Sequence, residues 1–162
     1  MTTTLAQHSI IDQFEREALD HPSQMYYKLD HEFLPCGNGQ YIYARTAHVP
    51  KGCLFSSLEH KTLHHFNLSK GVNLIYGTGK EPIRLIAPCR GTTEPGTRRL
   101  IFAEEDSIMT TYHLTTETDP EAVLAEITAP SRNPLLSEED KLRMQQHRIS
   151  MPSSREELPC PE

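Results

Sequence analysis

Apolar residues in the first twenty positions recur at the spacing of an α-helix. They lie near a period of 3.6 residues and comprise Leu5, Ile10, Ile11, Phe14, Ala18 and Leu19. This pattern predicts an amphipathic helix over residues 4–20, which Thr3 or Thr4 is suited to cap. The sequence HPSQ at 21–24 places a proline just after the pattern, where it ends the helix. The apolar stripe has to be buried, either against the rest of the domain or between copies in an oligomer.

From Tyr26 the pattern changes to short stretches rich in β-branched and aromatic residues. Turn sequences separate these stretches: GNG at 37–39, PKG at 50–52, GTGKEP at 77–82 and a longer loop at 89–99. Residues 26–118 therefore contain about seven or eight predicted strands, which is typical of an all-β sandwich or barrel.

Two further helices are expected after the strands. Asp119 as N-cap and Pro120 at the first helical position predict one helix over 119–127, and Ser137 begins another over 137–148. The tail at 151–162 has the composition of a disordered segment. We therefore divide the chain into an N-terminal amphipathic helix (1–25), a β-barrel (26–128) and a partly disordered C-terminal extension (129–162).

Composition narrows the function classes. The chain has 162 residues with 12 prolines and 8 glycines, which favours turn-rich β structure over a helical bundle. A net charge of −6 argues against duplex nucleic acid as a partner, because phosphate binding needs a basic face. There is no apolar run of about 18 residues to span a membrane and no basic region of a secretory signal. Four widely spaced cysteines indicate reduced thiols and a cytoplasmic protein.

Three histidines lie in the stretch HKTLHHFNLSKG, residues 60–71. A metal ion needs neutral imidazoles that converge on one point, and three suffice when solvent fills the open positions. His60 and His64 are four residues apart, so on an extended strand they would share a face but lie about 13 Å apart. A bend at Lys61 and Thr62 is therefore required for both to bind one ion. His65 has the opposite parity and is expected to face away.

The order and spacing of several segments resemble the cupin superfamily, and more narrowly a group of small cupin-like proteins of tailed bacteriophages. The matching segments are HEF at 31–33, YARTAHVPKG at 43–52, HKTLHHFNLSKG at 60–71, IAP at 86–88, PGTRR at 95–99 and EDSIMTTYH at 105–113. The resemblance implies an all-β core, a cupin-like double-stranded β-helix (jelly-roll barrel), with an N-terminal helix and a C-terminal helical extension. It also implies a phage-encoded accessory protein in the host cytoplasm.

In the first cupin motif, His60 falls at the second histidine position, and His64 occupies the glutamate position, with six residues between it and Gly71. Leu58 stands where the first histidine belongs, which is a departure from the motif.

In the second motif the Pro95–Gly96 turn is kept, but Arg99 stands where a metal-binding histidine would be. His113 shares a strand face with Met109 and Thr111, and the resemblance puts that strand against the same cavity. The resulting prediction is a divalent metal (Zn, Fe, Mn or Ni) bound by His60, His64 and His113.

Adjacent arginines suggest a second kind of site. A buried arginine must be paired or must bind an anion, because an isolated buried charge is costly. Candidate partners are Glu59, Glu104, Glu105 and Asp106. The alternative is that Arg99, Arg98 and Lys61 bind the carboxylate or phosphate of a small ligand.

Three functions therefore stay open at this point. The first is a cupin-like protein that binds a metal or small ligand, with or without enzymatic activity. The second is a non-enzymatic interaction protein, a homodimer or higher oligomer that binds a host or virion component. The third is a binder of an anionic metabolite that uses Arg98 or Arg99.

Overall fold

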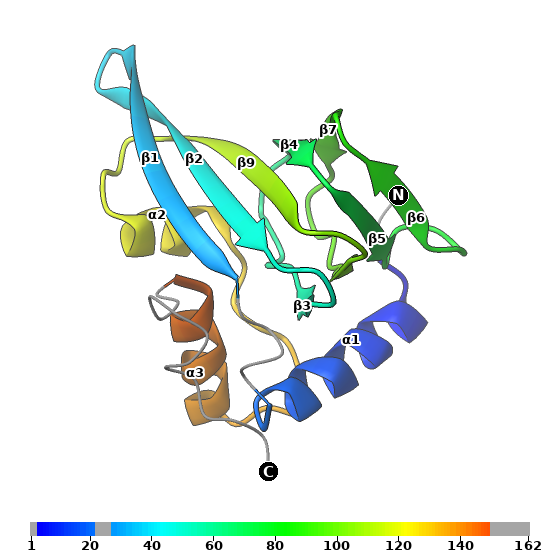
Figure 1. Cartoon of the computed structure of the whole chain (residues 1–162). Coiled ribbons are helices and arrows are strands. Elements are labelled where there is room, and N and C mark those ends of the chain that lie inside the picture. Colours follow the sequence, from blue (N-terminus) through cyan, green and yellow to red (C-terminus); the bar gives the residue numbers. More distant parts are fainter. Residues whose placement is uncertain (1–2, 22–26, 150–162) are drawn as a thin grey trace.

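The computed structural model describes residues 3–21 and 27–149. Within these residues the chain forms three helices and nine strands (Figure 1). The helices are α1 (Leu5–Ala18), α2 (Pro120–Ile127) and α3 (Glu138–Ile149). The strands are β1 (Lys28–Gly37), β2 (Gln40–Val49), β3 (Leu54–Ser56), β4 (His64–Lys70), β5 (Val72–Tyr76), β6 (Ile83–Ile86), β7 (Cys89–Thr93), β8 (Leu100–Ala103) and β9 (Ser107–Thr115).

The strands form two antiparallel sheets in the order β1-β2-β9-β4-β7 and β3-β8-β5-β6. The pairing is nested: β2 pairs with β9, β3 with β8, β4 with β7, and β5 with β6. The chain therefore behaves as one long hairpin that wraps around a common core, which is the jelly-roll arrangement. β1 adds a fifth strand to the first sheet by a hairpin with β2. The predicted all-β jelly-roll core is confirmed.

One segment was assigned wrongly from its pattern. Residues 89–99 were expected to form a loop, but Cys89–Thr93 is strand β7, which pairs with β4 along Leu68↔Cys89 to His64↔Thr93. The sequence CRGTT has no apolar alternation, and its strand form depends on the neighbouring strand. The turns expected at 37–39 and 77–82 do connect β1 to β2 and β5 to β6.

Alternation along β2 and β9 determines which side chains reach the interior. The register pairs Tyr43 with His113, Arg45 with Thr111 and Ala47 with Met109. Tyr43, Ala47 and His113 are buried, so the odd-numbered residues of both strands face the inside of the jelly roll. The deeper part of the interior is apolar and includes Val49, Phe55, Ile75, Ile101 and Ala103.

Helix α1 packs on its own domain, and of the stripe expected from the sequence Ile11, Ala18 and Leu19 are buried. Leu5 and Ile10 are exposed, whereas the buried face carries Gln7, Ile11, Asp12, Glu15 and Ala18. The expected N-cap is confirmed at Thr4, which forms a capping box with Gln7. Hydrophobicity alone missed the polar members of this face, because Asp12 and Glu15 are buried through ion pairs with distant arginines.

An ion-pair network explains that polar face. The Glu15 carboxylate accepts from Arg98 Nη2 and Arg148 Nη2, each at 2.9 Å, and from Asn133 Nδ2 at 3.0 Å. Asp12 accepts from Arg98 Nη1 at 2.7 Å. Burial by itself raises the pKa of Glu15, but Arg148 and Arg98 outweigh it, so this pKa lies below its ordinary value. The network ties α1 and α3 to the loop before β8.

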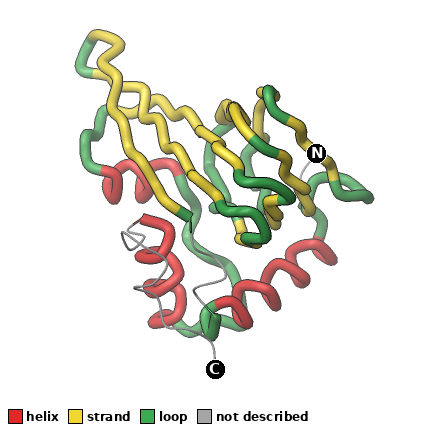
Figure 2. The backbone as a smooth tube through the Cα atoms, in the orientation of Figure 1, coloured by secondary structure: helices red, strands yellow, loops and turns green. Residues whose placement is uncertain are grey.

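The two other predicted helices are confirmed, with the expected caps at Asp119 and Ser137. Helix α2 covers one end of the first sheet, where its apolar residues pack on Tyr43. Met144 of α3 packs with Leu136 and with the end of α1. Figure 2 shows the helices gathered along one side of the strands. The predicted disorder of 151–162 concerns residues outside the described ranges.

Among the described helices, none is long and apolar enough to cross a membrane.

Candidate metal centre

Each of the three candidate histidines is positioned by a different element. His60 precedes β4 and forms an isolated bridge with Thr128, and its carbonyl accepts from the Gly96 amide at 3.0 Å. The chain then bends through 61–63, and His64 begins β4. His113 lies near the end of β9. The bend that the spacing of His60 and His64 required is therefore present.

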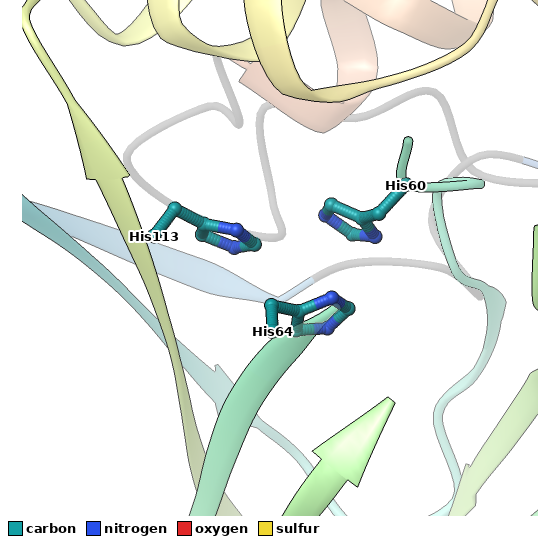
Figure 3. A group of neighbouring side chains, drawn as sticks. All are labelled: His60, His64 and His113. Atoms are coloured by element: carbon teal, nitrogen blue, oxygen red, sulfur yellow. The ribbon is translucent and has the colours of Figure 1, made fainter. Parts of the chain in front are cut away.

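The three imidazoles converge (Figure 3). One nitrogen from each of His60, His64 and His113 can be chosen so that all lie within 4.8 Å of one another. The ring centroids are 4.1 Å apart for His60 and His64, 4.9 Å for His60 and His113, and 4.8 Å for His64 and His113. Two nitrogens bonded to one ion at about 2.0–2.1 Å lie at most about 4.2 Å apart, so the rings have to move slightly closer together to bind an ion.

Burial keeps these imidazoles uncharged at neutral pH. Burial is the largest cause and, with the neighbouring rings, lowers the pKa of His60 to about 2. Burial, followed by the Arg99 charge, lowers the pKa of His64 to about 4. Burial, followed by His64 and Arg45, lowers the pKa of His113 to about 3. Neutral imidazole is the form that binds a metal, so no proton has to leave.

The hydrogen bonds of the trio leave nitrogens available for an ion. Nδ1 of His64 and Nδ1 of His113 are buried and have no hydrogen-bond partner among the described residues. Orphaned polar atoms of this kind are uncommon and call for a missing ligand. His113 Nε2 lies 3.2 Å from Thr111 Oγ1, a contact that orients the ring. Three buried nitrogen donors fit a divalent ion that prefers imidazole.

A cavity of about 60 Å³ opens beside the trio. Its described lining includes His60, His64, Thr111, Thr93 and Arg99, together with apolar residues of the core. A ligand in this cavity therefore lies beside His60 and His64.

Of the three residues expected to bind an anion, only Arg99 lines the cavity. The prediction for Arg98 is corrected: its side chain points away from the cavity, and its guanidinium pairs with Asp12 and Glu15. Lys61 is also corrected: its exposed Nζ donates to carbonyls at the end of α2, outside the cavity. Adjacent residues on an extended segment point to opposite sides, which separates Arg98 from Arg99.

The suggested acidic partners of the arginines are also wrong. Glu104 pairs with Arg84 at 2.6 Å, and Glu59 pairs with Arg132 at 3.1 Å. Asp106 accepts from the Lys51 amide. The true partners of Arg98 lie more than eighty residues away in the chain, so local sequence held no sign of them.

The sequence interpretation missed two cavity residues, Arg45 and Arg148. Arg45 lies on the same face of β2 as Tyr43 and Ala47, so strand parity predicts that its side chain points inward. His31 lies outside the trio, and its Nδ1 is 2.7 Å from the Tyr43 hydroxyl. His65 is exposed, as expected.

No family model matches the chain, and no curated protein matches it. Several solved structures are similar to part of it. An acetylacetone dioxygenase from Acinetobacter johnsonii is 20% identical over 53% of this chain and 59% of its own, with a TM-score of 0.40. KdgF from a Halomonas species is 13% identical over 54% of this chain and 90% of its own, with a TM-score of 0.40. An RmlC-like cupin from Shewanella frigidimarina is 14% identical over 51% and 83%, with a TM-score of 0.38.

The shared part amounts to roughly half of this chain, and less than two thirds of the dioxygenase. The nested strand pairing of this chain is what assigns the jelly roll. Phage origin is tested by none of these similarities and stays a prediction.

Proposed function

We propose that this protein binds one divalent metal ion through His60, His64 and His113, and that the open positions of the ion accept a small ligand from the adjoining cavity. The observation that supports the proposal is the convergence of three buried, neutral imidazoles within 4.8 Å. A purely structural histidine in a core normally has its ring nitrogens hydrogen-bonded, which is not so for Nδ1 of His64 and His113 within the described part of the chain.

The donor set favours particular ions. Imidazole suits Zn, Fe and Ni, whereas Mn prefers carboxylates, and no Asp or Glu is among the described lining residues. Three protein ligands leave at least one coordination position for water or a ligand, as in catalytic rather than structural sites. The ion would polarise a bound oxygen as a Lewis acid.

The chain's own residues would prepare that position. Thr111 holds the ring of His113, and the apolar side of the cavity limits access by water. Metal binding by itself does not establish catalysis, so an enzymatic role is a further hypothesis beyond this proposal. The resemblance to phage cupin-like proteins adds the hypothesis of a phage-encoded accessory protein, which the gene neighbourhood tests.

Metal content tests the proposal directly. Protein without a polyhistidine tag is purified and analysed by inductively coupled plasma mass spectrometry, with an expected content near one ion per chain. His64→Ala should weaken binding of the retained ion by at least about 100-fold, because even an outer partner of a metal ligand is worth 10–100-fold.

His65→Ala is the matched control, since His65 is the adjacent residue and points outward. It should keep full metal content. Metal at background level in the wild type, or equal loss in both variants, would refute the proposal. Circular dichroism of both variants separates loss of the ion from loss of the fold.

A further inference from the structure

The cavity beside the histidines carries positive charge that is only partly compensated. Three arginines line it, namely Arg45, Arg99 and Arg148, and the described lining includes no carboxylate. Arg148 is neutralised at its far side by Glu15. Arg45 and Arg99 have no ion-pair partner among the residues that the structure describes. A positive, partly closed cavity attracts an anion.

Arg99 is the more deeply buried of these two, at 8% exposure. Its Nη2 donates to Thr93 Oγ1 at 2.8 Å, and its guanidinium lies 5.8 Å from the centre of the Phe66 ring. Its Nε is buried and has no partner within the described ranges. These neutral contacts orient the group but supply no negative charge, and a buried charge without a counter-ion is costly.

The adjacent arginine, Arg98, does have carboxylate counter-ions. Arg98 is also buried, at 5% exposure, and it has two carboxylate partners, Asp12 and Glu15. Arg98 therefore forms structural ion pairs, whereas Arg99 lines the cavity without an ion-pair partner among the described residues. Because no carboxylate of the described residues compensates Arg99, a bound anion would supply the missing negative charge.

The guanidinium lies next to the candidate metal centre. Thr93, which accepts from Arg99, is the register partner of His64 across β4 and β7. Side chains that face each other in this way have Cβ atoms about 4.5–5.5 Å apart. A ligand of a few atoms can therefore contact the ion and Arg99 together.

We propose that the natural ligand of this cavity is a small carboxylate, whose carboxylate group pairs with Arg99 while another of its oxygens approaches the metal ion. The inference rests on the proposed metal site, because it names the class of ligand that the site would accept. The Nε edge of a guanidinium offers two parallel donors that match a carboxylate. The 60 Å³ cavity has room for about four to six water molecules, which suits a molecule of that many heavy atoms.

Calorimetric titration with a matched pair of probes tests the charge requirement. Pyruvate is a small 2-oxo carboxylate, and pyruvamide is its neutral analogue of nearly the same shape. Metal-loaded wild type should bind pyruvate about 10-fold or more tightly than pyruvamide, as expected for a hydrogen bond between charged groups. Arg99→Gln should remove this preference and leave the metal content unchanged. Lys61→Gln, a matched loss of one exposed charge outside the cavity, should retain it.

Three results would overturn the inference: equal binding of the two probes by the wild type, a preference that persists in Arg99→Gln, or tighter binding of inorganic phosphate than of pyruvate. The last result would assign the cavity to phosphate. Separate metal analysis distinguishes the two proposals. An Arg99-dependent preference for pyruvate in protein that binds no metal would retain the anion site and reject the metal site. One metal ion per chain without any preference for pyruvate over pyruvamide would retain the metal site and reject the anion site.

Discussion

Glu15 is the acidic centre that holds the helices to the jelly roll, and its removal should be strongly destabilising. The carboxylate is 2% exposed and compensates two buried arginines at 2.9 Å each. Glu15→Gln leaves Arg148 without a carboxylate partner among the described residues and leaves Arg98 with Asp12 alone. Breaking a buried ion pair on one side costs about 3–5 kcal/mol, because the other charge stays buried.

For a chain of this size that cost corresponds to a fall in melting temperature of about 6–20 °C. Urea denaturation followed by far-UV circular dichroism measures the free energy of unfolding of the variant and of Glu17→Gln, its control. Glu17 lies on the exposed side of the same helix, so its variant should change stability by less than about 0.5 kcal/mol.

A double-mutant cycle measures the coupling between Glu15 and Arg148. Arg148→Met in the Glu15→Gln background removes the uncompensated charge and should recover part of the lost stability. A loss of about 1 kcal/mol or less for Glu15→Gln, or no coupling between the two substitutions, would mean that the network contributes little. Because Arg148 also lines the cavity, Arg148→Met alone should in addition weaken pyruvate binding.

Three further predictions concern the site and its supporting turns. In the folded protein the pKa values of His60, His64 and His113 are about 2, 4 and 3. Below pH 6.5 these histidines therefore bind protons in the unfolded chain but stay neutral in the folded one. Metal-free protein should therefore lose stability as pH falls from 6.5 toward 4, by up to about 1.4 kcal/mol per pH unit for each histidine; thermal melts that are flat across this range would contradict it. Arg99→Met removes a buried unpaired charge and should raise the free energy of unfolding of the ligand-free protein by about 1 kcal/mol or more in denaturant titrations; a loss of stability would instead make the arginine structural. Gly71 has φ +85°, and a Cβ there would lie 2.5 Å from the Asp106 carbonyl oxygen, so Gly71→Ala should cost about 1–3 kcal/mol beyond Gly39→Ala, whose Cβ meets nothing within 4 Å. Equal losses in the two glycine variants would show that the close approach relaxes freely.

Much of the secondary structure was predictable because its signals are local. Caps at Thr4, Asp119 and Ser137 and the glycine-containing turns act within a few residues of chain, and the sequence contains them in full. Strand β7 was missed because its small polar residues become a strand only by pairing with β4.

The candidate site was predictable only in part. Strand parity placed His113 on an inward face and His65 on an outward one, and a bend between His60 and His64 followed from the reach of an extended chain. Parity would also have found Arg45. It could not distinguish Arg98 from Arg99, since their environments come from segments far away in the chain.

The sequence by itself determined the elements, their turns and caps, and the residues able to bind a metal, because these follow from periodicities and side-chain chemistry within short windows. Only the tertiary structure decided that three histidines from two strands and a bend meet within 4.8 Å. It also decided that acids of α1 neutralise one arginine, while the next one lines the cavity without an ion-pair partner among the described residues. Convergence and charge compensation are properties of pairs of distant residues, and the nested folding of the jelly roll creates those pairs.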